Sequence, residues 1–169
     1  IQILPVNDTG TNPSPYSAIS GYALHPIFLR LDEIPGSQQF AQEIETLRDR
    51  YRSEDRVKFQ DILSDKLALL KKIFDHDSET IINEENIRKW EQENPWIETY
   101  AVFRSLKTYY DEQSWISWPT MRNPRREDIE TYHKDNPKEI GYYIWLQYHC
   151  EGQLRRAACA LEEMGIALK

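Results

Sequence analysis

Apolar residues recur every three or four positions through most of this 169-residue chain, which is the spacing of helices that bury one face. The clearest stripe comprises Tyr143, Leu146, Cys150, Leu154, Ala157, Leu161 and Met164. Gly165 follows it and predicts a helix C-cap, because glycine readily adopts a left-handed backbone. The pattern therefore predicts a long final helix that begins near Asn136-Pro137 and ends at Gly165.

Four earlier stretches follow the same spacing. They run from about 37 to 52, from about 53 to 75, from 81 to 93 as a weaker candidate, and from Asn94 to Tyr110. Asn94-Pro95, Asn123-Pro124 and Asn136-Pro137 each place a good N-cap before the residue best tolerated in a first helical turn. Each pair therefore predicts the start of a helix.

The two ends of the chain favour strands instead. Residues near 1 to 4 are β-favouring, and residues 166 to 168 are short and apolar, like a buried parallel strand entered from a helix. A crossover connection would make the two strands parallel, but such a pair is not stable alone. Since the first residue is Ile and not Met, we expect an internal slice of a larger α/β protein.

We predict a long polar loop over residues 5 to 26, because their Asn, Gly and Pro residues rule out a helix or a continued strand. Loops longer than about 12 to 15 residues are usually functional. This one combines aromatic faces with short polar groups, namely Tyr16, Tyr22, Asn7, Asp8 and Ser14. That combination suits a sugar. The alternative is a structural turn with buried tyrosines. Asp8 could bind sugar hydroxyls or cap the loop through its own backbone as an Asx turn.

A second non-helical aromatic cluster spans Trp115 to Arg122. Trp115 and Trp118 could pack in the core or offer a platform to a sugar. The four histidines show no metal-ligand spacing, so neither a metal nor a cofactor is predicted.

The net charge of -7 argues against nucleic acid or an anionic membrane as a partner. Cys150 and Cys159 lie nine positions apart on one predicted helix and cannot pair with each other. Unpaired thiols, no leader-like segment and no apolar run approaching 18 residues predict a soluble, cytoplasmic protein.

Several segments resemble, in the same order, the 4-alpha-glucanotransferases, also called amylomaltases or disproportionating enzymes. They are Ile-Leu-Pro-Val-Asn-Asp-Thr-Gly at 3 to 10, Ser14-Pro15-Tyr16-Ser17, Ala23-Leu24-His25-Pro26, the helix Pro95 to Phe103, Trp115-x-x-Trp118-Pro119-x-x-Arg122, and Gln147 to Lys169. Residues 36 to 90 match only as generic helix. The Asn7-Asp8-Thr9 form resembles the branch that includes plant cytosolic maltose-using enzymes.

The resemblance implies a segment of a (β/α)8 TIM barrel in an α/β protein. Residues 1–35 would give a barrel strand and substrate loop, 36–136 a helical insertion, and 137–169 a barrel helix and the following strand.

The resemblance also implies a retaining transferase that moves α-1,4-glucan segments between maltooligosaccharides or glycogen- and starch-type glucans, with maltose or glucose as candidate acceptors. The family's three catalytic carboxylates lie on later strands, outside this chain, so the segment alone is expected to be inactive and to need the remainder of the parent polypeptide. Its expected contribution is substrate binding, through Tyr16 and Ser14, with Asp8, Asn7 and Trp118 as further candidates. The alternative is a non-catalytic helical interaction module or glucan-binding module derived from the family.

Overall fold

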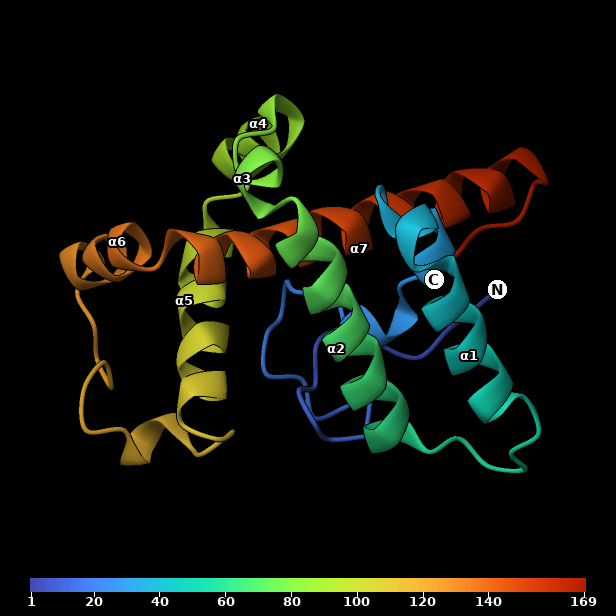
Figure 1. Ribbon diagram of the computed structural model, residues 1–169, viewed down its shortest axis with the longest axis horizontal. Helices are drawn as coiled ribbons and strands as arrows, with labels where there is room; N and C mark the ends of the chain where they lie inside the picture. Colours follow the sequence, from blue (N-terminus) through green and yellow to red (C-terminus); the bar gives the residue numbers. More distant parts are fainter. The chain divides into compact units, whose positions relative to one another are not determined.

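The computed structural model describes residues 1–169 and is mostly helical, as the periodicity predicts (Figure 1). Its α-helices are α1 (Ala41–Arg52), α2 (Phe59–His76), α3 (Ser78–Ile81), α4 (Glu85–Glu93), α5 (Trp96–Tyr109), α6 (Arg126–Asp135) and α7 (Pro137–Glu163). Short 3-10 helices lie at η1 (Pro26–Phe28), η2 (Leu31–Glu33), η3 (Ser37–Phe40) and η4 (Trp115–Ser117). No helix has both the length and the apolar character needed to cross a bilayer.

The chain divides into two compact units. The first contains residues 1–77 and 147–169, and the second contains residues 78–146. The three predicted segments were defined by their places in a barrel, whereas the two units are defined by compactness. The boundaries at 35 and 136 therefore stay a prediction. Helices α1 and α2 fall in the first unit because α2 packs on both α1 and η1.

The first unit has its core on α2, whose buried residues Leu63, Leu70 and Phe74 follow the helical spacing. Ile44 of α1 is also buried, and the two helices lie side by side (Figure 1). The exposed segment 53–58 is not helical, so the prediction of a helix from Ser53 is wrong. It offers only Val57 as an apolar residue, and that side chain lies in solvent.

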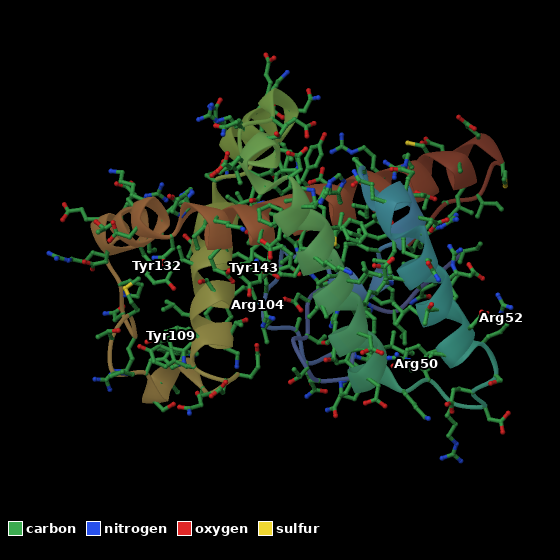
Figure 2. All side chains as sticks on the ribbon, viewed as in Figure 1. Arg50, Arg52, Arg104, Tyr109, Tyr132 and Tyr143 are labelled. Atoms are coloured by element: carbon green, nitrogen blue, oxygen red, sulfur yellow. The ribbon has the colours of Figure 1, made fainter.

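The second unit packs α5 against α6. Arg104 is buried on α5, with its guanidinium 6.0 Å from the ring centre of Tyr143 and 3.4 Å from the Glu112 carboxylate. Arg104 and Tyr143 are labelled in Figure 2. The Tyr143 hydroxyl also lies 2.8 Å from that of Thr108. A cation, an aromatic face and a carboxylate thus compensate one another at this buried position.

The Asn-Pro pairs act differently from the prediction. The Asn94 and Asn136 amides donate to the carbonyls of Trp90 and Tyr132, at 2.8 and 2.9 Å, and so close the preceding helices. Neither side chain caps the helix that follows, although α5 and α7 do begin beside these pairs.

The Asn123-Pro124 pair does not start a helix directly, which corrects that prediction. Helix α6 begins at Arg126, and the Asp128 carboxylate accepts the Arg125 N–H at 2.8 Å. This hydrogen bond lowers the pKa of Asp128. An acidic residue in the first turn thus stabilises the helix start by accepting the N–H of the N-cap residue.

The end segments form no strand, so the prediction of strands near 1 to 4 and 166 to 168 is wrong as stated. They are nevertheless hydrogen-bonded. The Ile3 N–H donates to the Lys169 carbonyl and the Lys169 N–H donates to the Ile1 carbonyl, both at 2.9 Å. In a parallel pairing, one residue bonds to the two residues that flank the residue opposite it, as Lys169 does here with Ile1 and Ile3. The pairing therefore has the predicted direction but is too short for a strand.

Helix α7 ends as predicted at Gly165, whose φ is 73°. The Ile166 N–H donates to the Leu161 carbonyl at 2.9 Å and the Gly165 N–H donates to the Glu162 carbonyl at 2.8 Å, which is a Schellman motif. The predicted apolar stripe is buried only up to Cys150, and beyond it Ala157 and Met164 are exposed.

Two glycines of this region should respond in opposite directions to alanine. Gly165→Ala should destabilise the fold by about 1 kcal/mol, because its left-handed backbone disfavours a side chain. Gly152→Ala should stabilise by about 0.5 to 1 kcal/mol, since it lies inside α7 and its new Cβ would meet only Arg156 Nη1 at 3.6 Å. Urea unfolding of both variants checks this, and equal signs would contradict the capping assignment.

Candidate functional site

The predicted loop from 5 to 26 is closed at its base by an antiparallel bridge between Asn7 and Leu24. The Asp8 N–H donates to the Ala23 carbonyl at 2.8 Å, and the His25 N–H donates to the Val6 carbonyl at 2.9 Å. In this kind of bridge the flanking residues make the bonds, so the N–H and C=O of Leu24 itself face away from Asn7.

Asp8 and His25 fill the inside of the loop base, where both are buried. The Asp8 carboxylate accepts the Gly10 N–H at 2.8 Å, which is the Asx turn given above as the alternative role. His25 Nε2 lies 3.1 Å from the Gly10 carbonyl and 3.9 Å from the Asp8 carboxylate. Its Nδ1 accepts the Ile27 N–H at 3.1 Å, so Nε2 carries the proton and donates. A role for Asp8 in sugar binding stays a prediction.

The outer part of the loop presents its aromatic faces to solvent. Tyr16 is 75% exposed and Tyr22 is 72% exposed, so they are not the buried tyrosines of the structural alternative. Ser14 is half-buried, and its carbonyl accepts the Ser17 N–H at 3.1 Å in a turn around Tyr16. Asn7 lies at the base, with its amide donating to the Gly21 carbonyl at 3.1 Å. The loop therefore holds a free ring above a fixed base.

Trp118 belongs to the second unit and is buried, with 2% of its surface exposed. Its ring stacks on Tyr110 at 5.4 Å between centres and lies 5.8 Å from Phe103. Its indole N–H has no hydrogen-bond partner. The geometry corresponds to the packing alternative, and a role in glucan binding stays a prediction. Trp115, 49% exposed, borders a 230 Å³ hollow beside it.

The structure reveals two site residues that the sequence reasoning missed, Gln147 and Gln153 of α7. The Gln147 amide accepts the Leu24 N–H and donates to the Leu24 carbonyl, both at 2.8 Å. The Gln153 amide does the same at Arg30, at 2.8 and 3.0 Å. Two glutamines at the edge of an apolar helix face were the available signal in the sequence. They could not be paired with their main-chain partners, which lie 123 residues away.

Lys66 of α2 supports the segment that leaves the loop. Its ammonium donates to the Ile27 carbonyl in η1 at 2.5 Å. Burial lowers the pKa of Lys66 to about 8, while a weaker effect of Cys150 raises it. Burial also raises the pKa of the Cys150 thiol well above its usual range. A 610 Å³ hollow beside these residues is lined by His25, Phe28, Cys150 and Gln153 among others.

Nowhere in the chain do three or more His, Cys, Asp or Glu side chains gather as a metal site would require. The loop instead combines exposed aromatic rings with polar groups on a hydrogen-bonded base. Such an arrangement can stack on and hydrogen-bond to a polyhydroxylated ligand.

The chain belongs to the 4-alpha-glucanotransferase family, whose model matches residues 1–169. It is 29% identical to the 4-alpha-glucanotransferase DPE2 of Oryza sativa subsp. japonica over 100% of this chain. It is 27% identical to a 4-alpha-glucanotransferase of Chlamydia pneumoniae, again over 100% of this chain. These two identities are too close to assign the plant-like branch.

The fold is similar to that of a solved amylomaltase from Streptococcus agalactiae in complex with acarbose, with a TM-score of 0.74 and 19% identity over 99% of this chain. The chain spans 19% of the rice relative, 33% of the chlamydial relative and 34% of the streptococcal chain.

The buried ammonium of Lys66 predicts a pH dependence of stability. In the unfolded chain a lysine keeps the ordinary pKa of 10.5, whereas here it is about 8. Between these values the unfolded state binds more protons, so this group makes folding more favourable as the pH rises from 8 to 10.5. Lys66→Met should remove that rise. The difference in unfolding free energy between wild type and variant, measured at pH 8 and pH 10.5, checks it; a constant difference would contradict the assignment.

Proposed function

We propose that this chain is a segment of a retaining 4-alpha-glucanotransferase, in which it contributes a barrel strand, a substrate loop and the helices of an insertion. Family membership over residues 1–169 is the observation that carries the proposal. The substrates would be α-1,4-glucans and maltooligosaccharides, with maltose or glucose as acceptor, in starch and glycogen metabolism in the cytoplasm. The acarbose held by the streptococcal amylomaltase supports binding of a glucan-like ligand.

Exposed apolar side chains support the proposal that a larger barrel covers this segment. Ile1, Ile3 and Leu4 are 61%, 42% and 59% exposed, and Met164 of the last helical stretch is 72% exposed. Apolar groups of this size gain free energy when another surface removes them from water. Neighbouring barrel strands would provide such a surface and would extend the short parallel pairing at the ends.

Retaining chemistry needs two carboxyl groups about 5 to 5.5 Å apart, one as nucleophile and one as acid and base. In the proposed parent these groups lie beyond this segment, on later strands. The part played by the segment is then to hold the sugar, with Tyr16 stacking on a ring and Ser14 beside it. The free face of Tyr16 and the turn around it support this role.

The activity test compares the segment with its parent. The full-length protein should convert maltotriose into shorter and longer maltooligosaccharides, with the anomeric configuration retained in the first products. The 169-residue chain should give no product above a buffer control, because in the proposed parent the catalytic carboxylates lie on later strands. Chromatography of the products and NMR of the anomers measure both. A full-length protein that binds maltooligosaccharides without converting them would favour the glucan-binding module.

Tyr16→Ala in the full-length protein should lower kcat/KM by at least about fivefold, since a stacked ring contributes on the order of 1 kcal/mol. Thermal stability should hardly change, because the ring is 75% exposed. Tyr22→Ala is the matched control, a ring of similar exposure on the same loop, and should change kcat/KM by less than about twofold. Equal losses in the two variants would remove the special role of Tyr16.

A further inference from the structure

At the base of the loop, Gln147 makes the two main-chain hydrogen bonds that a neighbouring strand would make. The Leu24 N–H and C=O face away from Asn7 in the antiparallel bridge, and the Gln147 side chain meets both at 2.8 Å. A primary amide carries one acceptor and two donors in the plane of a peptide group, so it can complete both bonds at once. Gln147 is 2% exposed and Leu24 is half-buried, so the two bonds are largely shielded from solvent.

The same device recurs further along, so the pairing continues beyond Leu24. Gln153 binds both main-chain groups of Arg30, and the Arg156 guanidinium lies 3.1 Å from the Glu33 carboxylate. Each pair is separated by 123 residues in sequence. The segment that leaves the loop therefore follows α7 in one fixed register.

The loop is tied to its own base by main-chain hydrogen bonds. Ile19 donates its N–H to the Asp8 carbonyl at 2.8 Å, and Asp8 in turn is bonded to Ala23. The position of the exposed Tyr16 ring thus depends, through the bridge, on the position of Leu24. Leu24 is held to α7 by the amide of Gln147.

We infer that Gln147 is a positioning residue, whose bidentate amide sets the Tyr16 loop in the place where it receives the sugar, with Gln153 extending the clamp along α7. The inference deepens the proposed function and rests on it for the sugar. The clamp itself rests on the hydrogen bonds of Leu24 alone. Loss of the amide would leave two main-chain groups without partners and free the loop base to shift.

The test is a double-mutant cycle in the full-length protein. Gln147→Met keeps an unbranched side chain of similar length but removes both bonds. It should lower kcat/KM by about fivefold, because a displaced contact loses most of its effect. In the Tyr16→Ala background the same change should cost less than about twofold, since the loop then has no ring to position. Where Tyr16→Ala itself lowers kcat/KM, additive losses, or no loss from Gln147→Met alone, would overturn the positioning role.

Two further variants separate positioning from general destabilisation. Leu70→Ala removes a fully buried α2 side chain of the same unit, and its effect on kcat/KM per folded molecule should be additive with Tyr16→Ala. Gln147→Glu keeps the shape and one acceptor but has no donor for the Leu24 carbonyl when ionised. It should lose at least as much as Gln147→Met, and full activity in this variant would overturn the bidentate clamp.

Hydrogen exchange tests the clamp independently of whether Tyr16 binds sugar. In Gln147→Met, peptides covering residues 5–26 should exchange at least about tenfold faster, while peptides of α2 keep the wild-type rate. If Tyr16→Ala leaves kcat/KM unchanged but this exchange increases, the sugar role of Tyr16 fails and the clamp stands. Unchanged exchange in the loop overturns the clamp whatever the kinetics show.

Discussion

The first unit depends on satisfying the peptide groups of a loop whose base is paired by a single bridge. A bridge of one residue pair fixes only one side of Leu24, and its other side would be left as an unpaired donor and acceptor. Unpaired buried groups each cost about 1 to 3 kcal/mol. The amide of Gln147 meets this requirement from a helix, and so a long polar loop acquires a defined position without neighbouring strands.

Lys66 and His25 answer the same requirement at the next turn. The lysine ammonium binds the Ile27 carbonyl, and the His25 ring accepts the Ile27 N–H. The main chain of η1 is therefore held by two side chains from opposite directions. Because α2 supplies the lysine and also the core residues Leu70 and Phe74, the burial that stabilises the unit also fixes the path of the chain out of the loop.

Periodicity alone located most helices, because a buried stripe leaves a pattern within a few consecutive turns. The predicted helix was too long at residues 53–58, which precede the first apolar residue of the stripe and face solvent. Local chemistry also identified the Gly165 cap and offered the Asx turn as one of two alternatives for Asp8, since both involve residues only a few positions apart. Asn94 and Asn136 show the limit of such rules. An asparagine between two helices can serve either one, and here its amide closes the earlier helix.

The clamp could not be predicted from the sequence, because nothing near Gln147 indicates that its partner is Leu24. The exposure of Tyr16 and the burial of Trp118 were equally open, since each ring had both a packing and a binding alternative. Only the three-dimensional positions separate them. The prediction of two end strands had the right direction of pairing. The two end segments lack neighbouring strands, so they form only a short hydrogen-bonded contact.

The constant offset of 123 between the segment 24–33 and α7 constrains which length changes the chain can accept. A residue inserted between Gln147 and Gln153 would turn the second amide about 100° around the helix axis, away from Arg30. A deletion between Leu24 and Arg30 would misalign the same pair from the other side. Residues gained or lost between 78 and 136, outside the first unit and before α7 begins, would change the offset without disturbing any pair in the clamp. That stretch is therefore the part of the molecule that can vary in length while the loop keeps its place.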